Sequence, residues 1–197
     1  MRKSRYTISS LTNPTNIDNA LTSMKNEKVN STLVSYYVQH IIDSFLISMA
    51  KRYDVKGKTY FKYPNKYYYT DIGLRNARLN YRQYDPGHIM ENIVYNELLR
   101  RGYSGDVGVV TDRTGGANTQ KGIDFVVNDA DKKIYIQSAF QMDADKKESS
   151  ELASLILTKD FFKKIIVRMD IPHNFYDDNG IFHCNLIDLL LGRVELF

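Results

Sequence analysis

The stretch from Gly87 to Ala139 constrains the fold of this chain most. Residues 87–101 carry apolar side chains at helical spacing, and Gly102 follows two arginines, which is typical of a helix C-terminus. Two apolar runs come after it, at 123–127 and 133–140, with the turn sequence Asn-Asp-Ala-Asp between them. This pattern predicts a pair of strands. The stretch therefore predicts a helix that carries Glu91, a strand that carries Asp124 and a paired strand that carries Gln137.

The rest of the second half adds further strands and helices. We expect strands at 106–111, 161–169 and 181–184, and helices at 145–157 and 186–191, from the periodicity of the apolar residues. Strands that alternate with helices favour packing of helices on a sheet. The sequence therefore predicts a mixed α/β fold, with an α/β sandwich in residues 85–197.

The first half has a different order of elements. Helical spacing predicts helices at 16–24, with Asn16 as N-cap, and at 30–44, with Asn30 or Ser31 as N-cap. The period then changes to two, which predicts a hairpin of strands at 45–53 and 59–63 around Gly57, with pairing continued at 67–69. Helices followed by a hairpin describe a winged helix. We place this domain at residues 1–84, before the linker that ends at Pro86.

Charge divides the chain in the same way. Up to Pro86 there are 14 Lys and Arg against six Asp and Glu, whereas from Gly87 onward there are 13 against 17. A basic half indicates an anionic partner, with DNA as the first candidate. The candidate nucleic-acid-binding residues are the cations of the predicted wing: Lys51, Arg52, Lys56, Lys58 and Lys62. Residues 31–44 contain no Arg or Lys, so a winged helix used for packing or protein contact remains an equal alternative.

Other function classes are disfavoured. The sequence has no apolar run of membrane-spanning length and no signal peptide at its start, and its one cysteine, Cys184, has no partner for an internal disulfide, so we expect a cytoplasmic protein with no membrane contact. Gly57-Lys58-Thr59 resembles the end of a phosphate-binding loop, but Arg52 stands where that loop needs a glycine. We therefore expect no ATP site in these residues.

Several segments resemble a known family. They are Gly87-x3-Glu91, Lys121–Val126, Ile134–Ala139, Arg52–Lys58, Lys66–Ala77 and Cys184–Leu190. Together they are similar to the C-terminal domain of unknown function attached to a family of bacterial and archaeal AAA-type ATPases. The resemblance implies a winged helix followed by a domain like the PD-(D/E)xK nucleases (restriction-endonuclease-like). It also implies that a P-loop ATPase module precedes this region in the whole protein, so ATP would bind only there.

The same resemblance assigns roles to the site residues. Glu91 is the helix acid and Asp124 the strand acid, and both are candidate catalytic residues and ligands for Mg²⁺. The second strand, where an acid and a lysine are expected, has Gln137 and Ala139 instead. Lys121 or Lys133 are candidates to replace the lysine.

Three hypotheses follow from this partial motif. The first is a non-catalytic, DNA-binding module of an AAA-type ATPase, with a degenerate nuclease site. The second is a Mg²⁺-dependent nuclease that uses Glu91 and Asp124, with Gln137 as an auxiliary ligand. The third is a protein-interaction or homo-oligomerisation domain.

Overall fold

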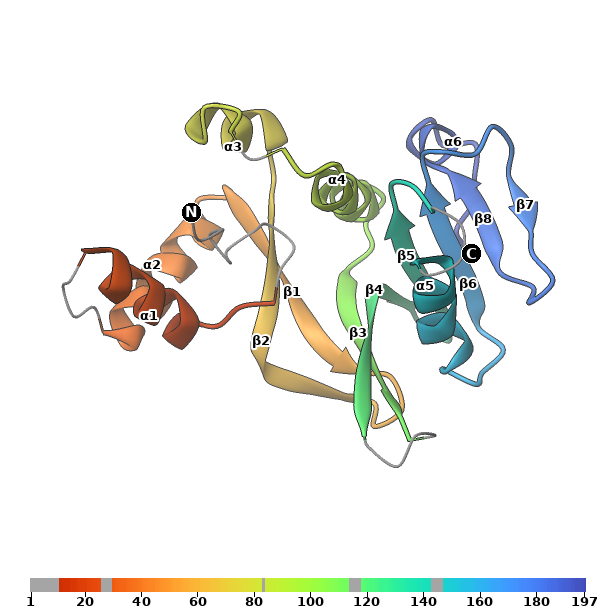
Figure 1. Cartoon of the computed structure of the whole chain (residues 1–197), viewed down its shortest axis with the longest axis horizontal. Coiled ribbons are helices and arrows are strands. Elements are labelled where there is room, and N and C mark those ends of the chain that lie inside the picture. Colours follow the sequence, from red (N-terminus) through yellow and green to blue (C-terminus); the bar gives the residue numbers. More distant parts are fainter. Residues whose placement is uncertain (1–10, 26–29, 83, 114–117, 143–146) are drawn as a thin grey trace.

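The computed structural model describes residues 11–25, 30–82, 84–113, 118–142 and 147–197, and has a mixed α/β fold built on one sheet (Figure 1). In this part of the chain the sheet has eight strands, in the order β2-β1-β3-β4-β5-β6-β8-β7. The strands are β1 (Ile47–Asp54), β2 (Thr59–Tyr69), β3 (Gly105–Asp112), β4 (Thr119–Asp129), β5 (Lys132–Ala139), β6 (Lys163–Arg168), β7 (Phe175–Tyr176) and β8 (Phe182–Asn185). The helices are α1 (Pro14–Lys25), α2 (Ser31–Asp43), α3 (Ile72–Arg78), α4 (Pro86–Arg100), α5 (Lys147–Ile156) and α6 (Leu186–Leu190).

Helices cover both faces of the central strands. In β5, Ile134 and Ile136 belong to one apolar core and Tyr135, between them, belongs to the other. The first core receives residues from α4 and α6, and the second receives Leu155 from α5. Strands buried on both faces are apolar at every position, which explains the continuous apolar runs in the sequence.

The hairpin β1–β2 extends this sheet at one edge. β1 pairs antiparallel with β2 and parallel with β3, over Arg52–Asp54 against Val107–Val109. Figure 1 shows α1 and α2 beside this hairpin at one end of the molecule, with β7 and β8 at the other end. The sheet thus crosses the expected boundary between residues 84 and 85. That boundary, and the winged helix before it, stay predictions.

Pairing within the hairpin is interrupted. Ala50 pairs with Lys66, but Arg52 pairs with Phe61, so one residue of β1 stands opposite four residues of β2, at 62–65. The peptide bond between Tyr63 and Pro64 is cis. The outer part of the hairpin and its base are therefore separate stretches of regular pairing, joined by a bulged segment.

A second bulge lies in β4. Asp106 pairs with Val126 and Gly108 pairs with Ile123, so the single residue between them on β3 stands opposite Asp124 and Phe125. A Cβ at Gly108 would lie 2.7 Å from Cγ2 of Val126 and 2.9 Å from Cβ of Ile123. Glycine is required at this position because the bulged strand approaches it so closely.

The C-terminus of α4 is tied to the end of the chain by Arg101. Its Nε lies 2.7 Å from Oε1 of Glu97, which is itself only 5 % exposed. The same guanidinium donates to the carbonyl oxygens of Val194 and Leu189. Arg101 therefore connects the helix that carries Glu91 with the last residues of the first core.

Most of the expected elements are present, with four corrections. The first helix begins at Pro14, and Asn13 caps it, since the N–H of Asn16 donates to Oδ1 of Asn13 at 2.7 Å. β1 begins at Ile47, because Phe45 has a positive φ of 59°. The helix expected from Gly87 begins one residue earlier and is capped by Asp85. The two-residue strand β7 was not expected, since it is too short for a periodic signal.

Within the described ranges, no helix is long and apolar enough to cross a membrane.

Candidate functional site

Glu91, Asp124 and Gln137, the residues expected to form the motif, lie on one helix and two neighbouring strands. Glu91 lies on the inner face of α4 and is only 8 % exposed. Asp124 lies in the bulge of β4, and Gln137 lies in the neighbouring strand β5. Bulges are common beside functional sites because they redirect a side chain. The helix and the two strands thus place the residues of the expected motif in one cluster.

A lysine that the motif does not contain joins the two carboxylates. Nζ of Lys66, on β2, lies 2.8 Å from Oε1 of Glu91 and 3.4 Å from Oδ1 of Asp124. The side chain of Lys66 is 12 % exposed. Two positions along the same strand, the hydroxyl of Tyr68 donates to the same oxygen of Glu91 at 2.6 Å. We call Lys66, Tyr68, Glu91 and Asp124 the carboxylate cluster.

Gln137 supports the bulge of β4. The N–H of Asp124 donates to Oε1 of Gln137 at 2.5 Å. The other oxygen of Asp124, Oδ2, accepts the backbone N–H of Ser138 at 2.9 Å. A bulged residue lacks its ladder partner, and the Gln137 amide supplies one here. An acid at position 137, as the expected motif has, would have to accept the same hydrogen bond from the N–H of Asp124.

Burial and charge shift the protonation of the cluster. Burial, and after it the charge of Asp124, raise the pKa of Glu91 to about 7, against the lowering effect of Lys66 and Tyr68. Burial also raises the pKa of the Tyr68 hydroxyl, which the charge of Glu91 reinforces. Burial opposes the charged form of Lys66, but the two carboxylates outweigh it and raise its pKa. Lys66 is therefore a cation at neutral pH, and Glu91 changes charge near neutrality.

The cluster does not fit a built Mg²⁺ site. Mg²⁺ takes six oxygen ligands at about 2.0–2.1 Å and relies on carboxylates that face it together. Here the ammonium of Lys66 bonds to one oxygen of each carboxylate, and Oε1 of Gln137 accepts a backbone N–H. Among the residues that the structure describes, no three His, Cys, Asp or Glu side chains are grouped so that they could hold a metal ion.

The two lysines expected as substitutes are placed elsewhere. Nζ of Lys133 lies 5.3 Å from the ring centroid of Tyr53 and 5.4 Å from that of Phe162. Lys121 pairs with Val110 in the ladder between β3 and β4. The lysine of the cluster is Lys66, from the first half of the chain. Its sequence signal is weak, since only its spacing of two from Tyr68 indicates a shared strand face.

The cations of the hairpin form a second candidate site. Lys51, Lys56, Lys58 and Lys62 are exposed, and across the described part of the chain none of them forms an ion pair. Arg52 differs, because its guanidinium donates to Oε1 of Gln120 at 2.6 Å and lies over the ring of Phe61. Nζ of Lys56 donates to the carbonyl oxygen of Thr111 at 3.4 Å, so it keeps its full charge for a phosphate, as do the ammonium groups of the other three lysines.

Comparison with known proteins finds one relative to report. An uncharacterized protein of Haemophilus influenzae is 38 % identical to this chain over 160 residues, which cover 81 % of the chain and 37 % of the relative. The chain therefore spans little more than a third of the length of that protein. No family model matches the chain. No solved structure matches it.

Proposed function

We propose that the chain is a non-catalytic DNA-binding module, the C-terminal winged-helix and nuclease-like region of a cytoplasmic AAA-type ATPase. The observation that carries this proposal is the ammonium of Lys66, which bonds to Glu91 at 2.8 Å and to Asp124 at 3.4 Å. In a nuclease, a metal ion neutralises these two acids and positions the attacking water. Here a side chain of the same protein neutralises them, so the cluster stabilises the fold in place of catalysis.

The hairpin β1–β2 supplies the surface for DNA. Lys56 and Lys58 lie in its turn, and Lys51 and Lys62 lie on its strands. Four exposed ammonium groups on one projecting element suit contact with phosphates, which accounts for most of non-specific DNA affinity. Because α2 carries no Lys or Arg, the proposed binding depends little on base sequence.

The ATPase module belongs to the proposal as a partner that precedes this region. The Haemophilus relative extends far beyond the matched 160 residues. That length leaves enough chain for a further domain of ordinary size. ATP would bind to that module, and this chain would place it on DNA.

Fluorescence anisotropy with a labelled duplex tests DNA binding. We expect the double variant Lys56→Ala, Lys58→Ala to lose about 8-fold in affinity per lysine at about 0.1 M salt, and the salt slope to fall by about 0.9 per lysine. The matched control is Lys132→Ala, Lys159→Ala, which removes two exposed lysines elsewhere. Lys58 and Lys159 both have a left-handed backbone, with φ of 53° and 54°. Absence of duplex binding at low salt, or equal losses in both double variants, would contradict the proposal.

A Mg²⁺-dependent nuclease remains the second candidate, and the convergence of Glu91, Asp124 and Gln137 favours it. A cleavage assay with Mg²⁺ or Mn²⁺ on duplex and single-stranded DNA decides between the two. We expect no cleavage beyond that of Asp124→Ala. Metal-dependent cleavage that Asp124→Ala abolishes would establish the nuclease instead.

A protein-interaction role is the third candidate. Leu33, Tyr37 and Ile41 recur at intervals of four on α2 and are 45 %, 59 % and 39 % exposed. Such an apolar stripe favours contact with another helix or with a second copy of the chain. Light scattering of the isolated chain across a range of concentrations would detect a homo-oligomer.

A further inference from the structure

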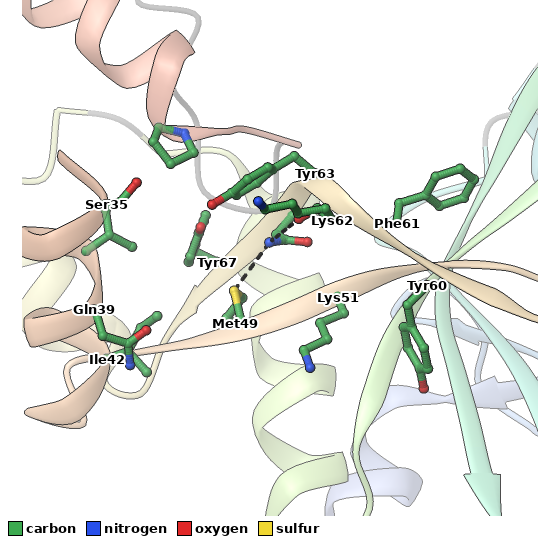
Figure 2. A pocket seen from close by; sticks show the side chains of 13 residues that line it. Ser35, Gln39, Ile42, Met49, Lys51, Tyr60, Phe61, Lys62, Tyr63 and Tyr67 are labelled. Atoms are coloured by element: carbon green, nitrogen blue, oxygen red, sulfur yellow. Dashed lines mark hydrogen bonds between the residues drawn. The ribbon is translucent and has the colours of Figure 1, made fainter. Parts of the chain in front are cut away.

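A groove lies between the helices α1 and α2 and the bulged part of the hairpin. It has a volume of about 480 Å³. Figure 2 shows Ser35 and Gln39 on the helical side, and Lys62, Tyr63 and Tyr67 on the side of the hairpin. Ligand pockets of a few hundred Å³ are common for small molecules and for single groups of larger ones.

The bulge in β2 creates this groove. Residues 62–65 have no partners in the regular pairing of β1 and β2, so this segment departs from the ladder. Asn65 fixes it at one side, because its backbone N–H and C=O both bond to Thr12, at 2.9 Å and 2.8 Å. Lys62 and Tyr63 are thereby held at the rim of the groove, both exposed to solvent.

The charge of the groove favours an anion. Its lining includes Lys51 and Lys62 but no Asp or Glu. Two acids lie at its margins and are already engaged: Oδ2 of Asp106 accepts the hydroxyl of Tyr60 at 2.7 Å, and Oδ1 of Asp43 accepts Nε2 of Gln39 at 2.8 Å. Asp106 also attracts the ammonium of Lys51, so a ligand in the groove would meet the charge of Lys62 and a partly offset charge of Lys51.

The aromatic side chains of the groove favour a flat ring. Tyr63 is 41 % exposed, and Nζ of Lys62 lies 6.0 Å from the centroid of its ring. Tyr67 lies beside it, half-buried. Aromatic platforms with neighbouring cations are typical of sites that bind single-stranded nucleic acids, where bases stack and phosphates meet lysines.

We propose that this groove binds an unpaired nucleotide of a single-stranded nucleic acid. The base stacks on Tyr63, and the flanking phosphates bind Lys51 and Lys62. A base inside a duplex is covered by its neighbours on both faces, so it has no face to offer to the tyrosine. The groove thus gives the module a preference for single strands, a refinement that rests on the proposed DNA-binding function.

Anisotropy measurements with a labelled oligothymidylate, the matching oligouridylate and a duplex test this site. We expect Tyr63→Ala to weaken binding of the single strands about tenfold, the usual effect of losing one stacked base, and to leave the duplex within about twofold. Tyr63→Phe keeps the ring beside Pro64 and should bind like the wild type. Tyr176→Ala is the matched control, since Tyr176 is 64 % exposed on β7, at the far edge of the sheet.

A second variant tests the groove without changing Tyr63, in case Tyr63→Ala alters the fold. Lys62→Glu replaces an exposed side chain and should also weaken single-strand binding about tenfold or more. If the duplex binds but Tyr63→Ala and Lys62→Glu leave single-strand affinity unchanged, this inference is wrong and the proposed function stands. If neither duplex nor single strands bind at low salt, both fail. Similar losses for the oligothymidylate and the oligouridylate are expected, whereas a loss with one alone assigns the groove to that type of strand.

Discussion

Replacing Lys66 by Met tests the role of the carboxylate cluster most directly. The change keeps the length and apolar stem of the side chain but removes the ammonium that lies 2.8 Å from Glu91 and 3.4 Å from Asp124. These acids have side chains only 10 % and 20 % exposed, so water replaces the lost partner poorly. Removing one partner of a buried ion pair costs about 3–5 kcal/mol. We expect a loss of that size in the free energy of unfolding at a pH of about 8, which is above the pKa of Glu91 in the wild type.

The same variant has a defined dependence on pH. Lys66 lowers the pKa of Glu91, which is about 7 with the lysine present, so the pKa rises further without it. The unfolded chain keeps the ordinary value, 4.5. The folded state therefore binds the additional proton, and stability is lost as the pH rises through the folded pKa, by about 1.4 kcal/mol per pH unit. The deficit of Lys66→Met relative to the wild type should thus be smaller at a pH of about 5.5 than at a pH of about 8.

Urea unfolding followed by circular dichroism measures these differences, since the chain has no tryptophan. Lys132→Met, at an exposed lysine, is the matched control and should change stability by no more than about 0.5 kcal/mol. The double variant Lys66→Met, Glu91→Gln removes both charges and should recover part of the loss at high pH. A deficit below about 1 kcal/mol for Lys66→Met at high pH, or one that shrinks as the pH rises, would refute a buried, charged cluster.

Three further predictions follow from the same packing. The wild type should lose about 3 kcal/mol of unfolding free energy as the pH rises from 4.5, the pKa of Glu91 in the unfolded chain, to about 7, its pKa in the folded protein. Glu91→Gln removes the titrating group and should abolish this loss in urea titrations at several pH values. Gly108→Ala should lower the free energy of unfolding by about 1–3 kcal/mol in thermal or urea unfolding, because the added Cβ overlaps two side chains of β4. Gly122→Ala is the control and should not have this cost, because an added Cβ there meets no atom within 4 Å. Equal effects of the two changes would contradict the close approach at Gly108. Arg101→Met should cost about 2–4 kcal/mol in the free energy of unfolding, since it leaves the buried acid Glu97 with one partner and frees two backbone carbonyls. Arg100→Met, at an exposed side chain, should cost clearly less in the same measurement.

The sequence predicts the helices and strands because periodicity is a local property. The alternation in 133–140 and the helical stripe of α4 both depend on which faces are buried, and both are read from neighbouring residues. The roles of Glu91 and Asp124 come instead from the resemblance of their segments, Gly87-x3-Glu91 and Lys121–Val126, to a known family. The strand order was not available from local patterns. Nothing near β1 indicates that Arg52–Asp54 pairs with β3, more than fifty residues later.

Lys66 could not be assigned from the sequence for the same reason. Its charge suggests a solvated surface, and it falls between the expected strand segments 59–63 and 67–69. It becomes the partner of Glu91 only because the hairpin joins the sheet beside β3, which places β2 against α4. The two lysines expected as substitutes lie on β4 and β5, whereas the lysine that pairs with Glu91 and Asp124 lies on β2, in the first half of the chain.

The bulge at 62–65 gives two lysines of one strand different surroundings. Lys62 and Lys66 are four residues apart, and in an uninterrupted strand they would lie on the same face of the sheet. The segment between them leaves the ladder, so Lys62 is exposed at the rim of the groove while the side chain of Lys66 is 12 % exposed and bonded to two carboxylates. Burial with two acids makes Lys66 unavailable to a phosphate, whereas Lys62 has no such partner among the described residues. A count of charges treats the two lysines alike, whereas the interruption of pairing between Ala50 and Arg52 leaves one of them buried with two acids and the other exposed to solvent.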